Sequence, residues 1–242
     1  MLKKVKQAHS AIHTLPEKQG AGAKLYDIIL GGQDGVVNVL GIALGVATAT
    51  NDARIVLISG LASTFAESLS MGAVAYTSAK AARDYYRSEV AREEREVDTM
   101  PQAEIQEIRD IYTKKGFKGQ LLEKIVKKIT SNKKMWIETM MAEELRMSPE
   151  NHAHPFSEAL LVGFASLVGS FIPILPFFFA TVEQSRYLAV AFSISVLFIT
   201  GSVKAKITIG KWWKSGLEMS AIGIVAALAG YGIGWLLGVA PL

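Results

Sequence analysis

The chain has 242 residues, half of them hydrophobic, and its 26 Lys and Arg against 22 Asp and Glu give a net charge of +4. Residues 80–157 hold 15 basic and 14 acidic residues, while apolar runs outside that block are long enough to span a bilayer, for which roughly 20 residues are needed. This pattern excludes an ordinary soluble enzyme and a disordered chain. Because the chain has no cysteine, it also excludes a disulfide scaffold, an iron–sulfur cluster and a thiolate zinc site.

Five apolar segments follow a polar N-terminal stretch that has no apolar region typical of a cleaved signal peptide. We predict membrane spans at residues 28–49, 55–75, 159–180, 187–203 and 217–239. Each is predicted to be a helix, because an isolated segment in lipid can satisfy its backbone only in that way. The predicted parts are an N-terminal segment (1–26), transmembrane helices one and two (27–80), an inserted helical domain (81–157) and transmembrane helices three to five (158–242).

The basic residues predict the orientation of these spans. All of the Lys and Arg residues except Arg54 and Arg186 fall on one side of the predicted membrane. Cytoplasmic loops are enriched in Lys and Arg, so the N-terminus and the 81–157 domain are predicted to be cytosolic. The basic excess therefore indicates a membrane protein and gives no reason to expect a nucleic-acid partner.

The charged block is predicted to be helical throughout. No proline occurs between residues 54 and 99, so the second span is expected to continue as one helix beyond the membrane. We expect Asp98 or Thr99 to cap a new helix that begins near Pro101 and stops at residues 114–116. Further helices fit residues 119–130 and 132–146. The fold class is thus an all-α membrane protein with five transmembrane helices and a cytosolic helical domain between the second and third.

Polar residues inside the first two spans are the first candidates for function. Asp34 and Asn38 are four residues apart on one helix face, and Ser63, Glu67 and Met71 form a similar stripe on the next span. A carboxylate in hydrocarbon costs roughly 2.5–3.5 kcal/mol on insertion scales, so it usually faces a partner, a cavity or a transport path. Carboxylate oxygens with a thioether suit a divalent transition metal; the alternative is a hydrogen bond that only helps the helices pack.

The charged block repeats acidic residues three or four positions apart, with a methionine among them. These candidate metal ligands are Glu93, Glu96, Glu104, Glu107, Met140 and Glu144. Helical bundles assemble carboxylate metal sites from such pairs, although a block this charged usually carries them as solvated faces. His9, His13, His152 and His154 lie in polar tails or linkers and are interpreted as solvated. No Glu-x-x-His or Walker A motif occurs, which disfavours a di-iron site, ATP drive and an organic cofactor.

Four segments together resemble the vacuolar iron transporter family. They are "DIILGGQDGVVNVLGIALGVATA", "SMGAVAYTSAKAARDYY", "TMMAEEL" and "LVGSFIPILPF", and they occur in one order from about Tyr26 to the C-terminus. The resemblance implies a homodimer of five-helix protomers that exchanges Fe²⁺ for protons and moves the metal out of the cytosol. Mn²⁺ is the second expected substrate, with Zn²⁺ or Co²⁺ possible, in the cell membrane of a prokaryote or the vacuolar membrane of a eukaryote.

The resemblance also assigns residues. It places Asp34 and Met71 on the translocation path and the six residues of the charged block at a cytosolic metal site. Relatives carry a second-span carboxylate two turns before the methionine, where this chain has Ser63, and we expect Glu67 to replace it. A membrane-anchored metal sensor or store without transport is the alternative. An enzyme is disfavoured because no nucleophile–base pair can be assembled.

Overall fold

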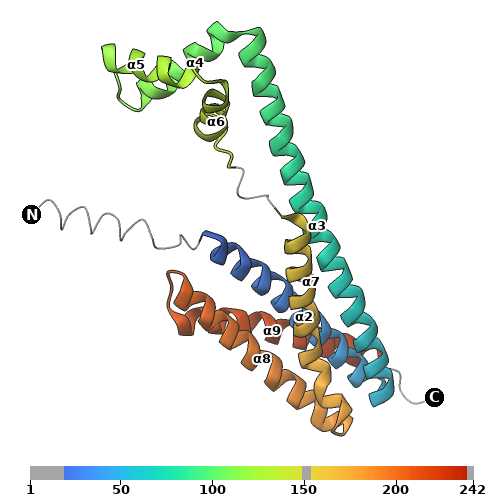
Figure 1. Cartoon of the computed structure of the whole chain (residues 1–242). Helices are drawn as coiled ribbons and strands as arrows, with labels where there is room; N and C mark the ends of the chain where they lie inside the picture. The colour runs from blue at the N-terminus through green and yellow to red at the C-terminus, as the bar shows by residue number, and fades with distance from the viewer. Residues whose placement is uncertain (1–18, 149–153, 239–242) are drawn as a thin grey trace, which may run out of the picture. The chain divides into compact units, whose positions relative to one another are not determined.

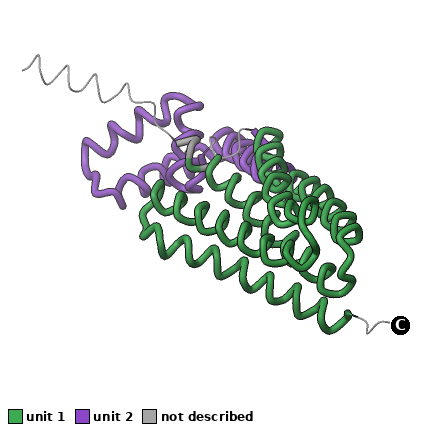
Figure 2. Tube along the Cα trace, turned by 90° about the horizontal axis from the view of Figure 1, so that it is seen from below, with its two compact units in different colours: residues 1–75, 156–242 green, residues 76–155 purple. Residues whose placement is uncertain are grey.

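The computed structural model describes residues 19–148 and 154–238, and every regular element in these two stretches is helical (Figure 1). The long helices are α2 (Gln19–Thr50), α3 (Ala53–Thr99), α7 (Pro155–Ile174), α8 (Val182–Ile207) and α9 (Trp212–Leu237). The short ones are α4 (Pro101–Lys114), α5 (Gly119–Thr130), α6 (Lys133–Glu143) and the 3₁₀ turn η2 (Leu175–Phe178). The chain divides into a membrane unit, residues 1–75 and 156–242, and an insert unit, residues 76–155 (Figure 2).

Five helices in the described part of the chain are long and apolar enough to cross a membrane, as the sequence predicted. Helices α2, α3, α8 and α9 are longer than their predicted spans, and α7 reaches 24 residues together with η2. Hydropathy marks only the stretch matched to hydrocarbon, whereas a helix continues into water wherever its flanks lack Pro and turn residues. Helix α2 begins at Gln19, inside the predicted N-terminal segment 1–26.

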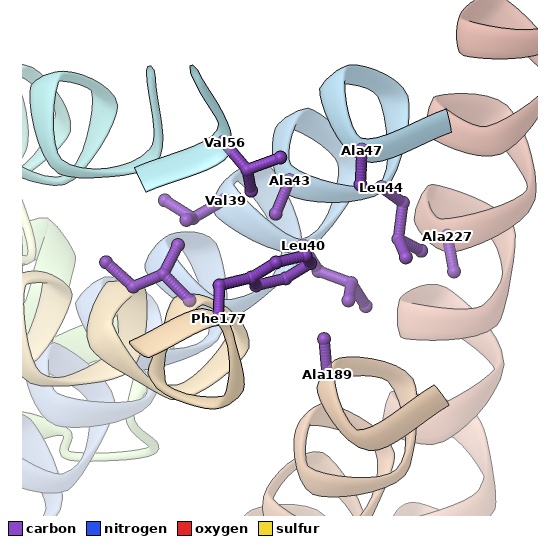
Figure 3. Packing of buried hydrophobic residues seen from close by; sticks show 10 residues of the cluster. Val39, Leu40, Ala43, Leu44, Ala47, Val56, Phe177, Ala189 and Ala227 are labelled. Atoms are coloured by element: carbon purple, nitrogen blue, oxygen red, sulfur yellow. The ribbon is translucent and has the colours of Figure 1, made fainter. Parts of the chain in front are cut away.

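The core of the membrane unit is built around the middle of α2. Val39, Leu40 and Ala43 are fully buried there, and they pack with Val56 of α3 and Phe177 of η2 (Figure 3). Leu44, Ala47, Ala189 and Ala227 extend the same cluster toward α8 and α9. One face of the helix is therefore packed against its neighbours over this stretch, and the side chains on that face are held in fixed directions.

The insert unit has its own core and its own polar links. Val97, Ile108, Val126, Trp136 and Met140 are buried together in it. The Arg109 guanidinium forms two hydrogen bonds of 2.9 and 3.1 Å with the Glu123 carboxylate, which join α4 to α5. Lys133 Nζ lies 2.5 Å from the Asp98 carboxylate and joins α6 to the end of α3.

The continuous second helix predicted from the missing prolines is confirmed, since α3 runs unbroken to Thr99. The predicted cap is wrong, because Asp98 and Thr99 both lie inside α3. Met100 precedes α4 without a side-chain cap, and Pro101 takes the first turn as predicted. The helix predicted to reach residue 146 ends at Glu143, since Arg146 has a positive φ of 54° that does not continue a helix.

Candidate metal path and acidic cluster

Asp34 and Glu67 are brought together in the membrane unit by α2 and α3. Their two carboxyl groups lie near enough to interact. The Asn38 amide donates a hydrogen bond to Asp34 Oδ1, at 3.3 Å from Nδ2. The predicted i, i+4 pairing on the first span is therefore present, and Glu67 faces the aspartate although it lies one turn from the family position at Ser63.

Helix α7 holds this pair of helices by close backbone contact. A Cβ atom added to Gly35 would collide with the Ser166 carbonyl and the Ser170 side chain of α7. On the same helix, a Cβ on Gly163 would lie 3.0 Å from the Ser68 carbonyl of α3. Small residues at both contacts let α7 approach the two helices that carry Asp34 and Glu67, so their spacing is fixed by backbone packing.

The other predicted path residues lie nearby in sequence but are less enclosed. Met71 is half-buried one turn after Glu67, and Asn38 is exposed on α2. Thr64, which the sequence reasoning missed, is fully buried between Ser63 and Glu67 and donates a 2.8 Å hydrogen bond to the Gly60 carbonyl. Nothing in the sequence pattern around this threonine distinguishes it from the neighbouring small polar residues.

The acidic residues of the insert unit form one electrostatic cluster. Glu93 is 1% exposed and Glu104 is 4% exposed, and Met140 is fully buried in the core that lies against them. Glu107 and Glu144 are exposed, and their carboxyl groups lie near enough to interact. Within the cluster, burial separates two enclosed carboxyls from two at the surface.

Burial and mutual repulsion raise the pKa values of Glu93, Glu104 and Glu144. Desolvation, followed by the charges of Glu107, Glu93 and Glu96, raises the pKa of Glu104 to about 7. Desolvation and then the charges of Glu107 and Glu93 raise the pKa of Glu144 to about 7, because its carboxyl is partly enclosed although the residue as a whole is exposed. The pKa of Glu93 is also raised, chiefly by burial. Such groups hold protons near neutrality and release them to a competing cation.

Arg92 is the cation that faces this cluster. Its guanidinium lies 3.2 Å from the Glu93 carboxylate and 3.6 Å from that of Glu96, and it also pairs with Glu89 at 2.9 Å. The sequence reasoning missed Arg92, although "REERE" places a basic residue beside each acidic pair. The cluster therefore contains a positive charge at the place where its carboxylates would attract a metal ion.

The arrangement falls short of a closed coordination sphere. Within residues 19–148 and 154–238, no three His, Asp or Glu side chains are positioned to hold one ion together. His154 is exposed, and His9, His13 and His152 lie outside the described residues. The carboxyls are thus near enough to repel one another, while coordination would need their side chains to turn inward.

Comparison with known proteins identifies the family. The model of the VIT family matches residues 25–235. The chain belongs to the VIT family. "Vacuolar iron transporter 2" of Oryza sativa subsp. japonica is 32% identical over 214 residues, which cover 88% of this chain and 87% of that protein. "Vacuolar iron transporter 1" of Arabidopsis thaliana is 30% identical over 212 residues, covering 87% and 85%. "Vacuolar iron transporter" of Plasmodium falciparum (isolate 3D7) is 30% identical over 247 residues, covering 96% and 90%.

Proposed function

We propose that this VIT family chain transports Fe²⁺ first and Mn²⁺ second out of the cytosol in exchange for protons. Membership of a family whose relatives are named iron transporters supports metal transport across a membrane, and a transporter rather than an enzyme. The observation that carries the finer proposal is the interacting carboxyl pair of Asp34 and Glu67, on two helices long and apolar enough to cross a membrane.

The chemistry of the pair supports proton exchange. Two carboxyl groups that face each other repel when both are ionised, so one of them favours its protonated form. A divalent ion bound between the two oxygens would displace that proton, and its departure would let a proton return. The half-buried thioether of Met71 offers a softer ligand one turn away, which favours Fe²⁺ over Mg²⁺ or Ca²⁺.

The acidic cluster is proposed to gather ions from the cytosol. Glu93, Glu96, Glu104, Glu107, Met140 and Glu144 supply hard and soft donors. The raised pKa values of Glu93, Glu104 and Glu144 make metal binding compete with protons. The excess of Lys and Arg supports a cytosolic insert unit and N-terminus.

A second copy of the chain is proposed to cover one face of α2. Asn38, Ile42 and Ala226 line an apolar groove of about 740 Å³ between α2 and α9. An exposed Asn38 side chain in hydrocarbon is unfavourable, whereas a partner helix packed on the small residues beside it can satisfy the amide. We therefore propose a homodimer in which the groove of each copy is closed by the other.

Uptake of Fe²⁺ into proteoliposomes with an imposed pH gradient tests the transport proposal. Glu67→Gln keeps the side-chain volume and the ability to hydrogen-bond but cannot ionise. We expect its flux to fall sharply and to lose most of its pH dependence, with partial rescue in Glu67→Gln/Ser63→Glu. Glu218→Gln, an exposed change on α9 of the same unit, is the matched control and should transport normally.

A near-normal flux with an unchanged pH profile in Glu67→Gln would refute the role of the pair. The rival reading, a membrane-anchored sensor or store, predicts instead that Asp34→Ala/Glu67→Ala leaves cellular metal tolerance intact. A carboxyl pair at membrane depth has no use in a bare anchor, which is why transport is preferred.

A further inference from the structure

A cavity of about 900 Å³ lies in the membrane unit between α8 and α9, beside the end of α2. One part of its wall is apolar and is formed by Leu44, Val190, Ile224 and Leu228. The other part is polar, with Glu183 and Arg186 in the first two turns of α8 and Asn51 just after α2. Figure 3 shows Leu44 and Ala227, from α2 and α9, at the edge of the core next to this space.

Backbone contacts between the helices create the cavity. Near its start α9 touches α8, where a Cβ on Gly201 would collide with the Ser215 carbonyl. Toward its end α9 touches α2 instead, where Gly230 and Gly234 meet the carbonyls of Gly41 and Gly45. Helix α9 therefore packs against α8 near its start and against α2 near its end. Helices α8 and α9 diverge where α8 begins. Because glycine contacts set this divergence, the space is part of the helix packing.

The Arg186 guanidinium is hydrogen-bonded to the protein through one terminal nitrogen. Its Nη2 donates to the Ala47 carbonyl at 3.0 Å and to Asn51 Oδ1 at 2.7 Å. Both bonds use one terminal nitrogen, and the buried Nε–H has no acceptor among the residues that the structure describes. A guanidinium has five donors in a planar fork, so donors suited to a phosphate remain.

Glu183 supplies the opposite charge three residues earlier on the same helix. It is exposed, and within the described ranges it forms no ion pair with Arg186. The cavity thus presents one cation with spare donors and one separate anion beside an apolar wall. A ligand that matches all three features carries a phosphate, a protonated amine and a hydrocarbon chain.

We infer that this cavity binds one phospholipid with a primary-amine zwitterionic head group, phosphatidylethanolamine being the simplest. The phosphate accepts from the free donors of Arg186, and the ammonium donates to the Glu183 carboxylate. One acyl chain lies against Val190, Ile224 and Leu228. The surrounding membrane is the source of the ligand, and the site does not depend on the metal path.

A lipid with an anionic head group and no amine is the discriminating competitor. Phosphatidylglycerol offers the same phosphate and chains, but it leaves Glu183 without a counter-ion. A partly exposed, charge-assisted hydrogen bond corresponds to a preference of about three- to fivefold. We therefore expect the delipidated full chain in detergent to bind phosphatidylethanolamine about three- to fivefold more tightly than chain-matched phosphatidylglycerol, measured by native mass spectrometry.

Two variants with matched controls test the assignment without altering Arg186, which also holds the end of α2. Glu183→Gln should bring the two affinities within about twofold, by losing the ammonium contact, while Glu218→Gln keeps the wild-type preference. Leu228→Trp should fill the apolar part and lose both lipids, while Leu236→Trp, on α9 outside the cavity lining, retains them.

Three results would overturn the inference. They are equal affinities for the two lipids in the wild type, an unchanged preference in Glu183→Gln, and unchanged lipid binding in Leu228→Trp. Competition between the lipid and water-soluble phosphoethanolamine is a further test. Displacement of the lipid at equal concentration would show that the apolar wall contributes nothing and would likewise reject a phospholipid site.

Discussion

Arg92 is expected to compete with the metal ion for the acidic cluster, so Arg92→Gln should tighten metal binding. The guanidinium contacts two proposed ligands, at 3.2 Å to the Glu93 carboxylate and 3.6 Å to the Glu96 carboxylate. A divalent ion that takes these oxygens must weaken both ion pairs and approach a positive charge. Removing the guanidinium removes both costs.

The size of the effect follows from the exposure of the pairs. The Arg92 side chain is 41% exposed, so each pair is screened and is worth about 0.2–1 kcal/mol. Two such pairs amount to about 1 kcal/mol, which corresponds to an affinity about fivefold higher. Part of this gain is offset, because the carboxyls hold protons more firmly once the neighbouring cation is gone.

Calorimetric titration of the full chain in detergent with Mn²⁺ or Co²⁺ at pH 7.5 measures this change. Arg109→Gln is the matched control, because Arg109 is also paired with a glutamate of the insert unit, Glu123, but lies outside the cluster. Its affinity should stay at the wild-type value. Weaker binding in Arg92→Gln, or the same change in both variants, would refute the competition.

Three further predictions concern pH, packing and assembly. The pKa of Glu104 is about 7 in the folded protein and 4.5 ordinarily. Between pH 4.5 and pH 7, Glu104 therefore keeps its proton in the folded protein and loses it in the unfolded chain. Without metal, Glu104 alone should lower the stability of the insert unit by about 3 kcal/mol as pH rises through that window; Glu104→Gln should remove this part of the slope and leave the part due to Glu93 and Glu144, measured by urea unfolding at Trp136 fluorescence with the other tryptophans replaced by Phe. Gly230→Leu should lower the melting temperature by several degrees or prevent folding, because its side chain collides with the Gly41 carbonyl; Gly232→Leu, with open space around it, is the control, and equal melting curves would contradict the contact. In this cysteine-free chain, Ile42→Cys should form a disulfide-linked dimer on mild oxidation if α2 faces its copy, and a monomer on non-reducing gels would argue against that interface.

The candidate sites were partly visible in the sequence because spacing along a helix decides which side chains share a face. Asp34 and Asn38 are bonded to each other as their four-residue separation predicts. Arg92 was missed because an ion pair depends on the direction of a long flexible side chain. The helix cap at Asp98 or Thr99 was wrong because α3 continues through both residues, and local cap preferences did not reveal this.

What the sequence determined by itself is the set of five apolar helices and the long α3, since hydropathy and the absence of proline act within one segment. The meeting of Asp34 with Glu67 and the divergence of α8 from α9 were decided only by tertiary structure. Both depend on glycine contacts between segments far apart in the chain. A glycine shows in the sequence that close approach is possible, but the partner backbone that it meets is fixed only when all the helices pack together.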